Sequence, residues 1–121
     1  VTIAFDTPGA LPYEMVTRLG KGTAVKILDG SILCDTRMTS FMKATATKHA
    51  IPYQLEILPA GGTDTGAIQR QANKGSIAGA ISIPLRHVHQ SIEMAHVQDI
   101  TSSIDLLIAT ITELDQWKWE L

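Results

Sequence analysis

The sequence predicts an α/β sandwich with a mixed, partly parallel sheet. Beyond residue 35, segments with strand periodicity alternate with segments with helix periodicity, which is typical of strand–helix–strand units. The chain has 121 residues, enough for one domain with a single core, and it shows no internal repeat or long linker. Residues 1–121 are therefore assigned to one domain.

Two strands are predicted near the amino terminus. Branched and aromatic residues favour a strand over Val1–Phe5, and the turn residues from Asp6 onward end it. Asp6 is better explained as a turn cap than as a ligand. An irregular connection over 10–18 leads to a strand at Ala24–Leu28, which the turn dipeptide Asp29-Gly30 closes.

A helix is predicted from Asp35 or Thr36 to about Ala50, after a short extended piece at 31–34 that pairs beside the preceding strand. Residues at spacings of three and four form one stripe that should face a core. The members of this stripe are Met38, Phe41, Met42, Thr45 and Ala46.

A strand, a glycine turn, a helix and a second strand follow. Tyr53–Leu58 alternates large apolar with polar residues, as a half-buried strand does. The next helix is expected at Thr63–Asn73, and a buried strand at Ala78–Ile83 is expected to end at Pro84.

The last predicted helix runs from Ile100 to about Asp115. Its expected buried stripe consists of Ile100, Ile104, Leu107, Ile108, Ile111 and Leu114. Trp117 and Trp119 are expected on the body of the domain or on a neighbouring subunit.

Composition excludes several classes of function. The net charge is −2 with both signs interleaved, so no basic stripe indicates nucleic acid, and Arg18, Lys21 and Lys26 are interpreted as a solvated face. No segment reaches the roughly 18 apolar residues of a membrane span. Cys34 is the single cysteine, which fits packing in a reducing compartment.

The candidate site lies in the stretch 58–96. Adjacent glycines allow close backbone approach or positive φ, and a threonine and an aspartate can cap the helix that follows. A basic residue and two histidines come just after a strand's carboxyl end, where ligands bind in open α/β sheets. The candidate residues are Gly61, Gly62, Thr63, Asp64, Arg86, His87 and His89.

The sequence does not support phosphate binding or nucleophilic catalysis, because the required residues are not at the required positions. Gly61–Gly66 has the spacing of a phosphate loop, yet Ala67 and Ile68 stand where lysine and serine or threonine are needed. Neither Ser82, inside a strand, nor Cys34 has the surroundings of a nucleophile.

Metal binding stays open. His87 and His89 are two apart in a loop taken as extended, so only one of them would face a given metal ion. Glu93 or His96 could complete a site if residues 90–94 were helical, although no H-E-x-x-H pattern is present.

Three motifs add to this interpretation: DTPG followed by LGKGTAVKILDGSILCD, AGGTDTGAIQ, and AISIPLRHVHQSIEM. In this order they resemble the carboxyl-terminal part of the tetrahedral aminopeptidases, dinuclear-metal glutamyl or deblocking aminopeptidases that are often mislabelled endoglucanases. The resemblance covers essentially the whole chain. It implies part of a three-layer, zinc-peptidase-like catalytic domain, peptide substrates, two zinc or cobalt ions, a cytoplasmic location and a dodecamer-type homo-oligomer without nucleic acid or membrane partners.

The resemblance also assigns residues. His89 matches the last metal ligand, the glycine turn Gly61–Asp64 matches a loop lining the substrate pocket, and Arg86 would brace the histidine loop. The other ligands and the catalytic glutamate would lie upstream, the last of those ligands directly before Val1. The chain, which begins in a strand-like run, is thus expected to be a carboxyl-terminal piece that is inactive alone, since a catalytic metal needs three or more protein ligands.

Two alternatives remain. The chain could be a noncatalytic fragment whose exposed apolar faces serve association with itself or with a missing half. A glycoside hydrolase would need two carboxylates about 5 to 10 Å apart across a cleft, for which Asp64 and Glu93 are the plausible pair.

Overall fold

The computed structural model describes residues 2–3, 16–71 and 73–120. These residues form two small mixed sheets and three helices, which confirms the predicted α/β class. The predicted strand at Val1–Phe5 is represented by two residues, and Asp6 lies outside the described residues. The elements are β1 Thr2–Ile3, β2 Thr23–Asp29, α1 Thr36–Lys48, β3 Tyr53–Leu58, α2 Asp64–Gln71, β4 Ile81–Ser82, β5 Pro84–Arg86, β6 Met94–Ala95 and α3 Val97–Glu113.

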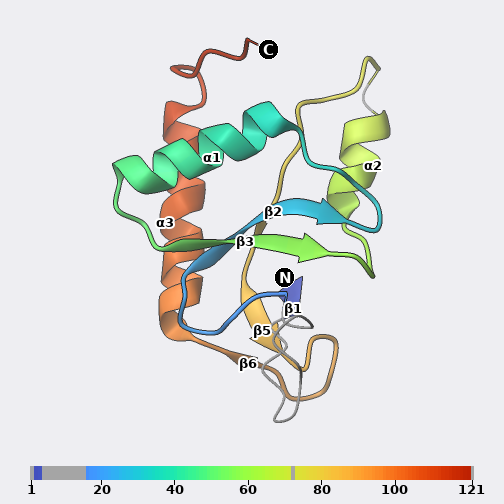
Figure 1. Ribbon diagram of the computed structural model, residues 1–121, viewed down its shortest axis with the longest axis vertical. Coiled ribbons are helices and arrows are strands. Elements are labelled where there is room, and N and C mark those ends of the chain that lie inside the picture. Colours follow the sequence, from blue (N-terminus) through green and yellow to red (C-terminus); the bar gives the residue numbers. More distant parts are fainter. Residues whose placement is uncertain (1, 4–15, 72, 121) are drawn as a thin grey trace.

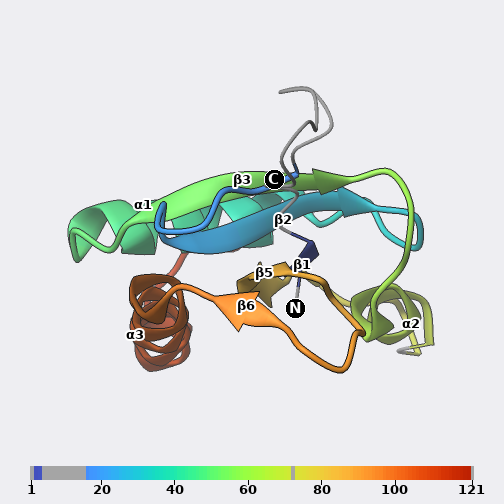
Figure 2. The same cartoon turned by 90° about the horizontal axis from the view of Figure 1, so that it is seen from below.

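Each sheet combines parallel and antiparallel pairing. In the first, β2 lies between β3, to which it is parallel, and β4, to which it is antiparallel. In the second, β5 pairs in parallel with β1 and antiparallel with β6. Figures 1 and 2 show β2 and β3 pointing toward α2, with α3 at the opposite side of the molecule. The carboxyl ends of both strands therefore meet the segment that leads into α2.

Local sequence placed most element boundaries correctly. Asp35 caps α1, because its carboxylate accepts a hydrogen bond from the Arg37 N–H at 2.9 Å. The predicted extended piece at 31–34 pairs through an antiparallel bridge between Leu33 and Leu28. Both tryptophans near the carboxyl end pack on the body of the domain, where their rings lie 5.2 and 5.3 Å from that of Phe41.

The prediction for Pro84 was wrong. The expected strand at Ala78–Ile83 is reduced to the short β4, and Pro84 begins β5 instead of ending a strand. A proline can stand first in a strand because the missing N–H at that position removes no essential ladder bond. The chain thus passes from one sheet to the other at Ile83, between β4 and β5.

The core lies between α1, α3 and the first sheet. Its buried residues are Val25, Met42, Ala46 and Leu106, and the predicted stripe of α1 faces it. Just before β2 begins, the N–H groups of Gly20 and Gly22 donate hydrogen bonds to the buried carboxylate of Asp99, both at 2.7 Å. This residue, which the sequence placed before the helix, therefore ties the start of α3 to the start of β2.

The predicted buried stripe of α3 was wrong. The residues of α3 that are buried are Asp99, Ser102, Ser103, Leu106 and Thr110. Five members of the expected stripe are exposed: Ile104 by 51%, Leu107 by 50%, Ile108 by 59%, Ile111 by 65% and Leu114 by 45%. The small polar residues face the sheet because they allow close packing and can satisfy their hydroxyls within the helix, as Thr110 does with the Leu106 carbonyl at 2.8 Å, or on the sheet, as Ser103 does with Thr23 at 2.8 Å.

The exposed stripe borders an apolar groove of about 410 Å³ between α3 and α1. Its walls include Met38 and Phe41 on one side and Leu107 and Ile111 on the other. Apolar surface of this extent usually contacts further protein.

Candidate functional site

The candidate site is built around the segment Gly61–Asp64, called here the glycine loop, at the carboxyl ends of β2 and β3 (Figure 1). Gly61 has φ of 93°, a conformation that favours glycine, as the sequence suggested. A Cβ on Gly62 would lie 2.9 Å from the Cβ of Ser31, so only glycine fits against the turn after β2. Gly61, Gly62 and Asp64 are exposed, which leaves this loop open to a ligand.

Thr63 is oriented differently from the predicted cap. Its hydroxyl donates a hydrogen bond to Asp29 Oδ2 at 2.8 Å, and its N–H donates to Ser31 Oγ at 3.2 Å. Asp64 occupies the first turn of α2. The glycine loop is therefore held mainly by the turn at the end of β2.

The turn at the end of β2 contacts a buried cluster of three charged residues, Lys26, Asp29 and Glu56. Lys26 Nζ lies 2.5 Å from Glu56 Oε1 and 3.6 Å from Asp29 Oδ2, and all three side chains are fully buried. The prediction that Lys26 belongs to a solvated face was therefore wrong, because its partners on β2 and β3 offset the cost of removing its charge from water.

The strand β3 alternates as predicted, but its polar side is the buried one. Leu55 and Ile57 are 50% and 55% exposed, whereas Glu56 between them is fully buried. Alternation alone did not indicate which side faces the interior. The buried side is selected by Lys26 on the neighbouring strand.

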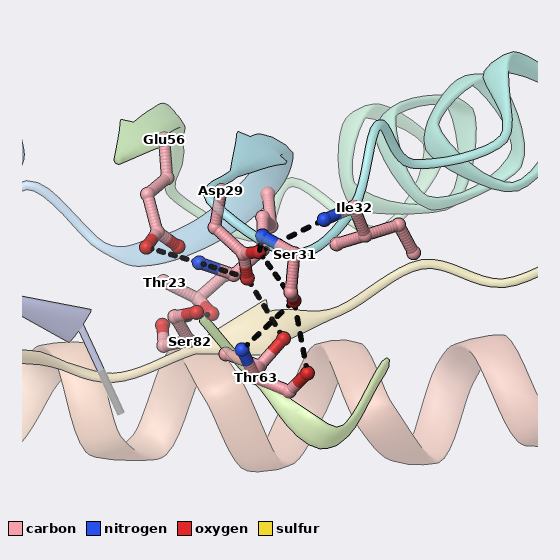
Figure 3. A network of polar contacts seen from close by, with 8 residues as sticks. Thr23, Asp29, Ser31, Ile32, Glu56, Thr63 and Ser82 are labelled. Carbon is pink, nitrogen blue, oxygen red and sulfur yellow. Dashed lines mark hydrogen bonds and ion pairs between the residues drawn. The ribbon is translucent and has the colours of Figure 1, made fainter. Parts of the chain in front are cut away.

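Hydrogen bonds converge on the carboxylate of Asp29 (Figure 3). Its Oδ1 accepts from the N–H and the hydroxyl of Ser31, both at 2.7 Å, and from the N–H of Ile32 at 3.1 Å. Burial raises the pKa of Asp29, but the bonds from Ser31 and Thr63 and the charge of Lys26 outweigh burial and hold that pKa below its ordinary value.

This shift predicts an acid dependence of stability. The unfolded chain binds the Asp29 proton at a pKa of about 3.9, above that of the folded chain, so the stabilisation is present above about pH 4 and is lost as the pH falls through the folded-state pKa. Urea unfolding of the wild-type chain and of Asp29→Asn between pH 6 and pH 2 measures it. The difference in unfolding free energy between the two should shrink toward acid pH; a constant difference would contradict the assignment.

The second part of the candidate site is the segment of residues 87–93 between β5 and β6, called here the histidine loop. His87 and His89 are both exposed and have φ of 59° and 62°, and the Gln90 N–H donates to the His87 carbonyl at 3.0 Å. The loop is thus a tight turn, not the predicted extended segment. The N–H of His89 donates to Glu93 Oε1 at 2.6 Å, which closes the turn.

Within the part of the chain that the structure describes, the neighbours of His89 do not complete a metal site. Among residues 2–3, 16–71 and 73–120, no three histidine, cysteine, aspartate or glutamate side chains are grouped so that they could hold a metal ion. Residues 90–92 are not helical, and His96 caps α3 by accepting a bond from the Gln98 N–H at 3.2 Å. One imidazole can supply one ligand, but these residues do not fit a complete metal centre.

The other candidate residues, Ser82, Cys34 and Arg86, lie inside or at the end of the sheets or their flanking segments. Ser82 and Cys34 are buried, and burial raises the pKa of the Cys34 thiol, which makes it a poor nucleophile. Arg86 is half-buried at the end of β5, directly before the histidine loop. In Figure 1 this loop lies in the lower part of the molecule, next to β5 and β6, whereas α2 lies in the upper part.

Sequence reasoning missed Asp29 and Ser31 as part of the site. Asp29-Gly30 was recognised only as a turn. The available signal was the serine two residues after the aspartate, a spacing at which an aspartate side chain accepts bonds from the backbone and so forms a small local turn. The bond from Asp29 to Thr63, 34 positions away, has no local signal.

Comparisons with known proteins show what the chain is similar to. The family model of M42 glutamyl aminopeptidases matches residues 1–106. A protein of Acetivibrio thermocellus that is provisionally named an aminopeptidase is 42% identical over 111 residues, which are 92% of this chain and 33% of that protein.

Solved structures extend the likeness to the fold. The aminopeptidase APDkam598 from the archaeon Desulfurococcus kamchatkensis is 38% identical, with a TM-score of 0.89 over 93% of this chain and 32% of its own. The TET1 peptidase of Pyrococcus horikoshii, which can assemble into a tetrahedron or a large octahedral shell, is 28% identical with a TM-score of 0.69 over 77% of this chain and 27% of its own. The chain thus spans about a third of the length of the first two.

Proposed function

The chain belongs to the M42 glutamyl aminopeptidase family, and from that premise we propose that it acts as the carboxyl-terminal part of an aminopeptidase catalytic domain. The full-length protein would hydrolyse amino-terminal residues from peptides. The observation that carries this proposal is the family match, which extends over both the glycine loop and the histidine loop. The M42 family is metal-dependent in general.

In this proposal His89 is one ligand of a site for two zinc or cobalt ions, and the other ligands and the general base come from outside this chain. Its exposed imidazole, on a turn closed by Glu93, is accessible to such a site. Arg86, the last residue of β5, would support the turn from behind. Metal ions would polarise the peptide carbonyl and lower the pKa of a bound water.

The glycine loop would bind the substrate in the same proposal. Its exposed backbone can approach a peptide closely because Gly61 and Gly62 carry no side chain. The loop is anchored on its inner side by Asp29 and Ser31, so its outer side stays free. These features support the assignment of Gly61, Gly62, Thr63 and Asp64 as substrate-binding residues.

The exposed stripe of α3 supports a place within a larger protein. We propose that the rest of the full-length polypeptide covers this stripe and the adjoining groove, since relatives of the chain are about three times as long. Assembly of such proteins into a closed, dodecamer-type homo-oligomer is supported by the TET1 peptidase, which can assemble into a tetrahedron or a large octahedral shell, and by the dodecamer of the PhTET1-12s structure. A cytoplasmic location is supported by the buried free thiol of Cys34. Separately, no helix in the described part of the chain is long and apolar enough to cross a membrane.

Peptide hydrolysis by the full-length protein tests the proposal. The full-length protein, loaded with zinc or with cobalt, should release amino-terminal residues from short peptides, whereas the 121-residue chain treated identically should release none. Peptides with a blocked amino terminus and a soluble cellulose derivative serve as control substrates. No release from free peptides, or cleavage of the polysaccharide instead, would contradict the proposal.

A further inference from the structure

Hydrogen bonds between residues about 30 positions apart join the turn after β2 to the glycine loop, including the following three. The Gly30 N–H donates to the Gly61 carbonyl at 2.7 Å, and the Thr63 N–H donates to Ser31 Oγ at 3.2 Å. The third bond joins the Thr63 hydroxyl to Asp29 Oδ2 at 2.8 Å. Figure 3 shows Asp29 and Ser31 facing Thr63 across this junction.

The carboxylate of Asp29 organises the junction. A hydroxyl has one proton, and Ser31 Oγ lies closer to Asp29 Oδ1, at 2.7 Å, than to the Thr63 carbonyl, at 3.1 Å. With its proton directed to Asp29, Ser31 Oγ is free to accept from the Thr63 N–H. Asp29 thus holds Thr63 directly through the hydroxyl and indirectly through Ser31.

The charge of Asp29 is itself held in place. The side chain is buried and lies 3.6 Å from Lys26 Nζ, which also contacts Glu56 on β3. Hydrogen bonds to an ionised acceptor are stronger than those between neutral groups, so the junction is stiffer than the same contacts to an amide would make it. The ion pairs of Lys26 with Asp29 on β2 and with Glu56 on β3 fix the position of the Asp29 carboxylate relative to the sheet.

The glycine loop has few other means of keeping its shape. Gly61 and Gly62 have no side chains to pack, and Asp64 is exposed. We infer that Asp29 is a positioning residue, which holds the glycine loop in the shape that binds the peptide substrate. This inference rests on the proposed function, because it takes the glycine loop as the substrate loop.

A positioning role predicts which kinetic constant changes. Asp29 lies behind the loop and contacts Thr63, so loosening it should weaken substrate binding and leave the chemical step largely intact. In the full-length, metal-loaded protein, Thr63→Val is expected to raise KM about 10-fold, the factor for one lost hydrogen bond to a charged group, with kcat within about 2-fold of wild type. Asp29→Asn should raise KM at least as much, because it also weakens the bonds from Ser31.

Matched variants separate positioning from loss of stability. Thr63→Ser keeps the hydroxyl that donates to Asp29 and should raise KM less than Thr63→Val does. Asp99→Asn breaks a buried carboxylate network at the other end of β2 and should lower the unfolding temperature while KM stays unchanged. All assays are run below the unfolding temperature of the least stable variant.

The outcomes distinguish the inference from its premise. A wild-type full-length protein that releases no amino-terminal residues would overturn the proposed function. An active wild type with Thr63→Val unchanged in KM, or with kcat reduced and KM unchanged, would overturn the positioning role alone. If Asp29→Asn does not fold, the KM of Thr63→Val alone tests the positioning role. Thr63 is only half-buried, so its replacement should disturb folding less.

Discussion

Replacing His89 by asparagine in the full-length protein is expected to lower its metal content and to reduce kcat/KM for peptide release by at least about 100-fold. Loss of a group that only orients a metal ligand costs about 10- to 100-fold in metal affinity or activity, so loss of a ligand should cost at least as much. Metal content by elemental analysis and the rate of release of amino-terminal residues measure the two effects.

The neighbouring histidine offers a closely matched control. His87 and His89 lie in the same turn, are both exposed and have φ of 59° and 62°. Asparagine tolerates this left-handed conformation, so His87→Asn and His89→Asn disturb the backbone similarly. His87→Asn should keep the metal content and the activity of wild type. Equal losses in both variants, or unchanged metal in His89→Asn, would show that His89 is not a ligand.

Replacing Lys26 by methionine is expected to lower the unfolding free energy of the chain by about 3 to 5 kcal/mol, because Glu56 and Asp29 would remain as buried negative charges without their common cation. Methionine has a similar length, so the loss reflects charge more than volume. Chemical denaturation monitored by circular dichroism measures it.

Two further variants test whether the buried pair is the cause. Lys26→Met combined with Glu56→Leu removes both members of the shortest ion pair and should recover much of the lost stability. Lys21→Met changes an exposed lysine five positions earlier and should alter the unfolding free energy by no more than about 0.5 kcal/mol. If Lys26→Met were as mild as Lys21→Met, the cluster would have no structural importance.

The positions of the elements could be predicted because their signals are local. Asp35 caps α1 with its own side chain, and Tyr53–Leu58 forms β3 with the predicted bounds. The glycine turn before α2 was also predicted correctly, since a glycine pair is visible in the order of residues, whereas the histidine loop was expected to be extended and is a tight turn. Hydrogen bonds between near neighbours determine these features, and near neighbours are known from the sequence.

The direction in which each amphipathic element faces could not be predicted. In both β3 and α3 the periodicity was identified correctly, but the stripe assigned to the core in α3 is exposed, and the buried side of β3 is the one that carries Glu56. Periodicity states that two faces differ, but the buried face depends on what packs against it. Glu56 faces inward because Lys26 lies on the adjacent strand, and the stripe of α3 is exposed because no element in the described part of the chain covers it.

The candidate site divides in the same way. Residue types and their spacing were enough to mark Gly61–Asp64, His87 and His89 as candidate residues, whereas only the resemblance to a known family indicated an aminopeptidase and singled out His89. The support of the glycine loop by Asp29 and Ser31, and the burial of Lys26, emerged only when distant strands were brought together. Backbone conformation follows from residues a few positions apart, whereas a buried charge needs partners from elsewhere in the chain, and folding alone selects them.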